Sequence, residues 1–129
     1  MNLLHMVKEV GSRLNYQEIA CVETKIDVIM ANFSDEIILA VWKKGTVVPN
    51  YDSAAWRKDQ CGAWIGFQFY GDRSSDYGWE IDHITPQAKG GTDNLSNLRP
   101  LHWRNNVKKS DGRLSCAVEA SGNNNVEKK

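Results

Sequence analysis

The pattern of apolar and polar side chains in the middle of the chain predicts two strands that follow one another in the sequence. In AWIGFQFYG, residues 63–71, every second side chain faces one side and the others face the opposite side. The first set is Ala63, Ile65, Phe67 and Phe69, and the second is Trp64, Gln68 and Tyr70. Gly71 and Asp72 break this strand, and GWEIDHI, residues 78–84, predicts a second strand.

A loop, a further strand and a helix follow these two strands. The Gly90-Gly91 pair predicts a long loop. NLRPLHW, residues 97–103, predicts a short strand, in which Pro100 indicates a strand end or an edge strand. WRNNVKKSD, residues 103–111, predicts a short helix. The chain is therefore expected to form an α+β fold.

The beginning of the chain gives a less definite pattern. Apolar residues between Ile19 and Met30 recur at helical spacing, which predicts an amphipathic helix, although KIDVIM, residues 25–30, fits a short strand equally well. Ser34 fits the N-cap of a helix that runs toward Lys44.

These patterns divide the chain into three parts. Residues 1–55 are expected to form a helical or strand extension that packs on a core over residues 56–115. The tail, residues 116–129, is polar and ends in SGNNNVEKK, so we expect it to be disordered. With 129 residues, the chain has room for one domain with a modest core.

Composition excludes several classes of protein. The chain contains no run of about 18 apolar residues, so no membrane span is expected. Its first residues lack the pattern of a secretion signal. Cys21, Cys61 and Cys116 are widely separated and form no CxxC pair. We therefore expect no structural zinc, and we expect reduced thiols in a cytoplasmic protein.

Charge is distributed unevenly, although the formal net charge is zero. Between Arg99 and Arg113 the chain has five basic residues and one acidic residue, Asp111, whereas residues 1–55 have five basic and seven acidic residues. This basic segment predicts a surface that faces phosphates, or else a solvated helix face.

Four side chains between residues 82 and 106 are suited to phosphodiester hydrolysis. Asp82 can bind a hard cation through oxygen, and His83 can take a proton near neutral pH. Asn97 can hold a loop, and Asn106 can complete a metal site. Taken alone, His83 could equally be a buried histidine and Asp82 a surface carboxylate.

The order of these motifs resembles the HNH endonucleases, whose active site is the ββα-metal (His-Me finger) motif. The resemblance covers roughly residues 56–113. Its matching segments are EIDHITP, the Gly90-Gly91 pair, Asn97-Leu98, and Asn106 followed by Lys108-Lys109-Ser110-Asp111. WRKDQCGAWI followed by YG also resembles the segment before this motif in small phage and bacterial members.

The resemblance implies a role for each residue. His83 would be the general base, and Asp82 and Asn106 would bind one divalent metal. Mg²⁺ is favoured because two oxygen ligands leave room for water and the phosphate. Asn97 would hold the loop and orient the histidine. Asn106 is preferred over Asn105 because it keeps the family's spacing.

The resemblance also implies a partner and a reaction. Phosphate contacts are expected from Lys109 above all, and from Lys108, Arg104 and Arg113. The protein is expected to be a metal-dependent DNA endonuclease leaving 5′-phosphate and 3′-hydroxyl ends. A monomer would nick DNA, a homodimer would cut both strands, and a protein partner could supply specificity.

Several alternatives stay open. His102 and Glu80 are weaker candidates for metal ligands. The chain could be a catalytically weak module that binds DNA through the same fold, or it could be a toxin-type nuclease domain.

Overall fold

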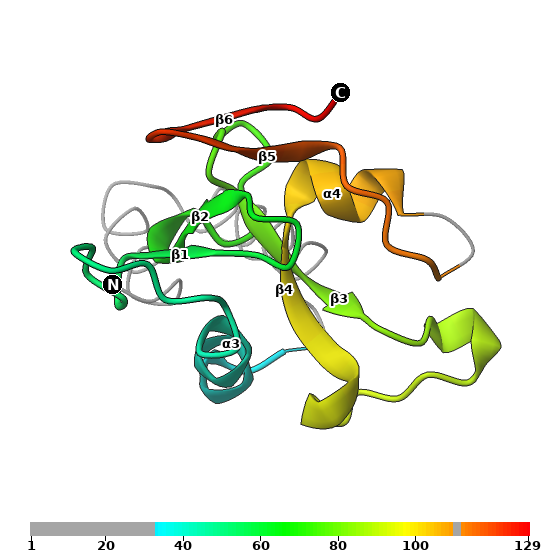
Figure 1. The fold of residues 1–129 in the computed structure, drawn as a ribbon. Helices are drawn as coiled ribbons and strands as arrows, with labels where there is room; N and C mark the ends of the chain where they lie inside the picture. The colour runs from blue at the N-terminus through cyan, green and yellow to red at the C-terminus, as the bar shows by residue number, and fades with distance from the viewer. Residues whose placement is uncertain (1–32, 110–111) are drawn as a thin grey trace, which may run out of the picture. The chain divides into compact units, whose positions relative to one another are not determined.

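Two antiparallel strands and the helix after them form the part of the fold that carries the predicted site. A computed structural model describes residues 33–109 and 112–129. Strand β3 (Trp79–His83) pairs with β4 (Leu98–His102), and the pairing runs from Trp79 opposite His102 to His83 opposite Leu98. Helix α4 (Trp103–Lys108) follows β4 directly and turns back along β3 (Figure 1). The predicted order of strand, loop, strand and helix is present.

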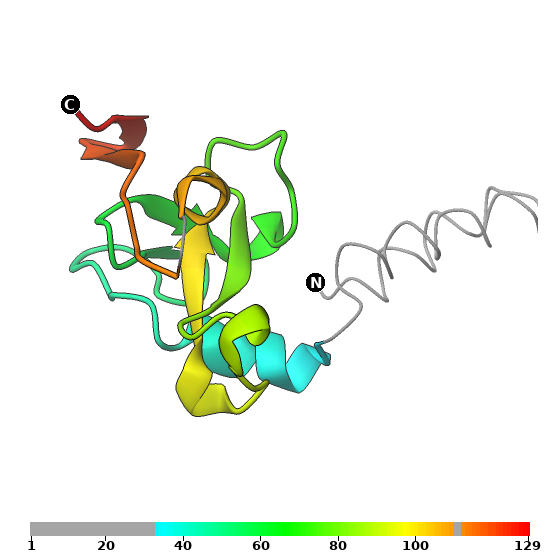
Figure 2. The ribbon, with the colours of Figure 1, turned by 90° about the vertical axis from the view of Figure 1, so that its right-hand side faces the viewer.

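Four further strands form two small antiparallel sheets. Strand β1 (Trp56–Lys58) pairs with β2 (Trp64–Gly66), and β5 (Val118–Ser121) pairs with β6 (Asn124–Glu127). Figures 1 and 2 show α4 and the β5–β6 hairpin near one end of β4, and helix α3 (Asp35–Trp42) near the other. Mixed helices and strands agree with the predicted α+β class.

The first predicted strand is shorter than the alternation indicated. Strand β2 ends at Gly66, and Phe67–Phe69 form a 3-10 turn. A Cβ atom at Gly66 would lie 2.6 Å from the Phe69 ring, so the turn folds that ring back onto the glycine. The prediction of a strand through residue 70 is therefore wrong beyond Gly66.

A cluster of aromatic side chains forms the centre of the core. Trp42 of α3 is 1% exposed, and its ring lies 5.2 Å from that of Trp79 and 5.5 Å from that of Phe67. Residues Glu36–Lys129 form one compact unit, so residues 36–55 belong with the predicted core. The helix or strand predicted near residues 19–30 lies outside the described residues.

The tail is ordered, so the prediction of disorder after residue 116 is wrong. Its hairpin turns at Gly122 with a φ of 59°, a backbone conformation that glycine adopts readily. Asn125 accepts a hydrogen bond from the backbone N–H of Trp64 at 2.7 Å and donates one to its carbonyl at 2.9 Å. A side-chain amide therefore attaches this largely polar hairpin to β2, while Val118 is its buried apolar residue.

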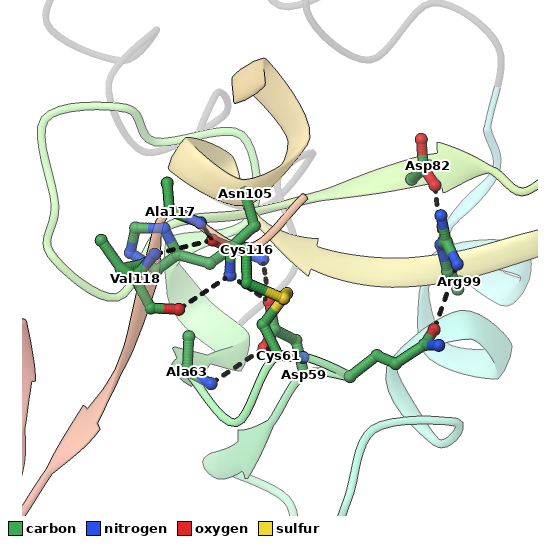
Figure 3. The surroundings of a disulfide bond; sticks show 11 residues. Asp59, Cys61, Ala63, Asp82, Arg99, Asn105, Cys116, Ala117 and Val118 are labelled. Carbon is green, nitrogen blue, oxygen red and sulfur yellow. Dashed lines mark hydrogen bonds and ion pairs between the residues drawn. A yellow bond between two sulfur atoms is a disulfide. The ribbon is translucent and has the colours of Figure 1, made fainter. Parts of the chain in front are cut away.

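Cys61 and Cys116 form a disulfide (Figure 3), so the prediction of reduced thiols is wrong for this pair. The two cysteines are 55 positions apart in the sequence, with their Cα atoms 5.6 Å apart. The disulfide also removes the basis on which a cytoplasmic location was expected. Cys21 lies outside the described residues. No helix within the described ranges is long and apolar enough to cross a membrane.

Candidate active site

Asp82 is a buried carboxylate between two cationic side chains. It is the fourth residue of β3 and is 5% exposed. Lys109 Nζ donates to its Oδ1 at 2.7 Å, and Arg99 Nε donates to its Oδ2 at 2.7 Å. Arg99 lies opposite Asp82 in β4 and also donates to Gln60 at 3.1 Å (Figure 3). Both carboxylate oxygens are therefore used by positive charge.

Lys109 joins the end of α4 to the end of β3. It is the C-cap residue of the helix, and its ammonium group also donates to the backbone carbonyl of His83. Its side chain is 9% exposed. In this arrangement Lys109 contacts Asp82 and is covered by protein, whereas the sequence predicted a contact with DNA phosphate.

Asn106 contacts β3 through Glu80. Its Nδ2 donates to Glu80 Oε1 at 2.8 Å, while Arg73 binds the same carboxylate with two hydrogen bonds of 2.6 and 2.9 Å. The hydrogen bond to Glu80 raises the pKa of Arg73 above its ordinary value. Glu80 and Asp82 are two residues apart on one strand, so both face α4. Asn106 and Lys109 therefore meet the same face of β3.

His83 is the last residue of β3, where the strand gives way to the loop. Its Nε2 lies 2.7 Å from Oδ1 of Asp93, a loop residue. Gln87 Nε2 donates to the same oxygen at 3.4 Å. The His83 side chain is 17% exposed, so the ring is held by the loop and still reachable from solvent.

Asn97 holds the loop between β3 and β4 with three hydrogen bonds. Its Oδ1 accepts from the backbone N–H of Thr85 at 2.8 Å. Its Nδ2 donates to the carbonyls of Thr85 and Thr92 at 3.1 and 2.8 Å. Gly91 packs against this region so closely that a Cβ atom there would lie 1.7 Å from the carbonyl oxygen of Thr85. The loop shape therefore depends on both Asn97 and Gly91.

The neighbouring asparagine on α4 has a structural position. Asn105 is fully buried and donates to Asp59 at 3.0 Å. Its Oδ1 accepts from the backbone N–H groups of Ala117 and Val118 at 2.7 and 2.9 Å (Figure 3). Asn105 thus anchors the C-terminal segment beside the disulfide, which leaves Asn106 as the amide that faces β3.

His102 is the N-cap of α4. Its Nδ1 accepts from the backbone N–H of Arg104 at 3.0 Å, and its Nε2 lies 2.7 Å from the carbonyl of Asp76. Burial lowers the pKa of His102 below its ordinary value. A neutral ring meets both contacts, because one nitrogen can accept while the other donates. His102 therefore stabilises the helix and is no part of the site around Asp82.

The side chains of Asp82 and Asn106 carry oxygen atoms, the type of ligand that a hard cation prefers. Among the described residues, no group of three or more His, Cys, Asp and Glu side chains could hold a metal ion. A cation here would depend on the carboxylate of Asp82, the amide oxygen of Asn106, water and a phosphate. Such a sparse set of oxygen ligands is compatible with Mg²⁺, which keeps several of its waters.

A basic groove runs between α4 and the C-terminal hairpin. Its volume is about 360 Å³, and Arg104, Lys108 and Lys128 line it together with one acidic residue, Glu127. The side chains of Arg104 and Lys108 are exposed, as is that of Arg113 outside the groove. Lys128 was missed by the sequence analysis because the tail was expected to be disordered.

Two further residues that contact the site, Asp93 and Arg99, were not predicted from the sequence. Asp93 lies in the loop between the matching segments, where a single acid carries no recognisable spacing. Arg99 was counted only as part of the basic segment. Glu80 was a weaker candidate for a metal ligand, because strand alternation places it on the same face as Asp82; in the structure it binds Asn106 and Arg73.

Comparisons with known proteins find a family match for the segment that holds this site. The family model described as HNH endonuclease matches residues 66–112, which include β3, the loop, β4 and α4. No curated protein and no solved structure matches the chain. The match over residues 66–112 supports the resemblance of this part of the chain to the HNH endonuclease family.

Proposed function

We propose that this protein is a metal-dependent DNA endonuclease with its active site where β3 and α4 meet. The observation that carries this proposal is the contact of two α4-segment side chains, Asn106 and Lys109, with Glu80 and Asp82 on one face of β3. His83, the last residue of that strand, follows Asp82 directly. These positions all lie within the segment matched by the family model.

His83 acts as the general base in this proposal. Asp93 orients the ring through its contact with Nε2, and the imidazole would take a proton from the attacking water. Histidine is the side chain that most often serves as a general base in catalysis. Asn97 keeps the loop that carries Asp93 in place.

Asp82 and Asn106 would hold the divalent metal, for which Mg²⁺ is the best candidate. A bound cation would supply positive charge to the phosphate and to the departing oxygen. Asp82 Oδ1 must first be released by Lys109, because both carboxylate oxygens are paired. A released Lys109 ammonium would be free to contact the phosphate, which would combine its observed and its predicted roles.

The rest of the DNA backbone would lie along the exposed basic side chains. Arg104 and Lys108 project from α4 into the groove, and Arg113 is exposed nearby in sequence. Contacts of this kind fix the position of a duplex without reading its sequence. They predict that DNA binding weakens steeply as salt is raised.

The test is cleavage of supercoiled plasmid by the purified protein in Mg²⁺, in Mn²⁺ and in EDTA. Nicked or linear product that requires metal is expected from the wild-type protein. The His83→Ala variant should be inactive, with an unchanged melting temperature. A folded wild-type protein that cuts no plasmid with either metal would contradict the proposal.

A second candidate is a module that binds DNA through this fold without cutting it. The pairing of both Asp82 oxygens with Arg99 and Lys109 favours this candidate, because a carboxylate satisfied by two cations needs no metal. Salt-sensitive DNA binding that is indifferent to EDTA and to His83→Ala would support it. Metal-dependent cleavage would exclude it.

A further inference from the structure

We propose that an aromatic pocket at the tip of the β5–β6 hairpin binds an unstacked nucleobase of single-stranded DNA. The pocket has a volume of about 290 Å³. Its lining residues are Tyr51, Trp56, Trp64, Tyr77 and Asn123. The proposal rests on the proposed function for its partner, DNA, but its site is separate from the one around Asp82.

Four aromatic rings give the pocket flat apolar walls. The rings of Tyr51 and Trp64 lie 4.8 Å apart, and those of Trp56 and Tyr77 lie 5.1 Å apart. Trp64 is 4% exposed and forms the floor, whereas Tyr51 is 42% exposed. The volume is at the small end of ligand pockets, which suits one ring system. Every nucleobase has a flat face that can stack on such rings.

The rim of the pocket offers a fixed amide. Tyr51 donates its hydroxyl hydrogen to Oδ1 of Asn123, and Tyr77 donates to the Asn123 carbonyl at 2.9 Å. Trp64 Nε1 donates to the neighbouring Gly122 carbonyl at 2.7 Å. These bonds hold the hairpin tip in place before any ligand arrives, and preformed sites lose less entropy on binding. The Nδ2 group of Asn123 can then donate to a base edge.

Charge favours a base over a cation as the occupant. Aromatic cages also bind quaternary ammonium groups. Here the ammonium group of Lys58 already lies 4.8 Å from the centre of the Trp64 ring. None of the five lining residues has a carboxylate. A second cation would be repelled, whereas a nucleotide would bring its negative phosphate toward Lys58.

The hairpin connects this pocket to the basic groove. Asn123 lines the pocket, and Glu127 and Lys128 at the other end of β6 line the groove. At about 3.3 Å per residue, the two sites lie roughly 16 Å apart along the strand. One DNA strand following the hairpin could place phosphates beside Lys128 and a base in the pocket.

The experiment compares short oligomers that have the same charge and different bases. The full chain in EDTA is titrated with oligothymidylate and with an abasic oligomer of equal length, and tryptophan emission is recorded. Oligothymidylate should bind about tenfold more tightly than the abasic oligomer, a factor within the range of base stacking on one aromatic side chain. It should also quench the emission. Equal affinities, or no binding of oligothymidylate, would overturn the proposal.

A matched pair of variants locates the effect. Tyr51→Ala should remove the preference for oligothymidylate, while Leu39→Ala should keep it. Leu39 is a fair control because it is 43% exposed, close to the 42% of Tyr51, and lies on α3 outside the pocket lining. Tyr51→Phe keeps the ring and should retain the preference. A preference that survives Tyr51→Ala in folded protein would contradict this site.

The two proposals fail in different ways. If the plasmid is cut and abasic and thymidylate oligomers bind alike, the pocket proposal is wrong and the nuclease stands. If thymidylate is preferred through Tyr51 and no plasmid is cut, the pocket stands and the nuclease proposal is wrong.

Discussion

At the scale of single residues, the contacts of two carboxylates define the candidate site. Asp82 binds two cationic side chains, and Glu80 binds the amide of Asn106. Glu80 is a positioning residue in this account, because it accepts a hydrogen bond from the Nδ2 group of Asn106 and thereby fixes the orientation of that amide. Arg73 in turn holds Glu80. Partners of this kind commonly affect metal affinity nearly as much as the ligands do.

We therefore expect Glu80→Ala to weaken metal binding about tenfold, the lower end of the range for such partners. The measurement is Mn²⁺ binding by calorimetry, together with the Mg²⁺ concentration that gives half-maximal plasmid cleavage. Arg73→Gln is the control, because it removes the ion pair and leaves the Glu80–Asn106 hydrogen bond available. Equal metal affinity in wild-type and Glu80→Ala protein would show that Glu80 does not position Asn106.

The ion pair between Lys109 and Asp82 predicts that a change of Lys109 has opposite effects on metal affinity and on cleavage. Lys109→Met removes the cation that competes for Oδ1, so metal affinity in the absence of DNA should rise about tenfold, the size of a charged hydrogen bond. Cleavage should fall, because the phosphate loses a contact. Calorimetry with Mn²⁺ and plasmid cleavage measure the two effects separately. A loss of metal affinity in this variant would mean that Lys109 supports the cation and does not compete with it.

At the scale of elements, α4 depends on a neutral histidine at its N-terminus. The folded protein lowers the pKa of His102, so the unfolded chain binds a proton more readily than the folded chain. Stability is then complete above the unfolded value of about 6.5 and is lost as the pH falls below it. A protonated ring would also lose the Nδ1 acceptor used by the backbone N–H of Arg104.

We expect the melting temperature of the wild-type protein to fall as the pH is lowered through about 6.5. The melting temperature of His102→Asn should fall less over the same range. Asparagine caps a helix without titrating, so the difference between the two proteins isolates His102 from the other ionisable groups. Thermal unfolding followed by circular dichroism measures it. Parallel pH profiles for the two proteins would exclude this contribution.

The elements differ in how far local sequence specifies them. Strand β3, the loop, β4 and α4 follow from nearby signals: an apolar alternation, a glycine pair, a proline and a short basic helix. The hairpin of the tail also had a local signal, since Gly122-Asn123 is a two-residue turn of the hairpin type. Its strands are polar, however, and their partners near Trp64 are 61 residues away. Pattern alone could not show that contact.

For the candidate site, the sequence indicated the main residues but not their contacts. The identities of Asp82, His83, Asn97 and Asn106 were available from spacing and resemblance, and their roles remain proposals. The contacts that surround them were not available, because Lys109, Asp93 and Arg99 meet these residues through the fold. The same limit applies to Asn105, which spacing could only compare with Asn106 and which the structure places in the core.

At the scale of the whole molecule, the disulfide stabilises the fold by joining the turn between β1 and β2 to the segment after α4. In the chain-entropy model, a loop of 55 residues corresponds to about 4 kcal/mol of stability. Cys61→Ser with Cys116→Ser should therefore lower the free energy of unfolding by about 2–4 kcal/mol. Urea denaturation measures this change. An unchanged urea midpoint after reduction would contradict it.

The Cys61–Cys116 bond also makes residues 61–116 a closed covalent ring. Arg113 lies inside that ring and is exposed, so trypsin could cut the backbone after it. The cut would open the ring without separating the pieces, since residues 114–129 carry Cys116 and stay attached to Cys61. Such a nicked protein would run as one species on a non-reducing gel. A reductant would release the hairpin as a small peptide, and with it one wall of the basic groove.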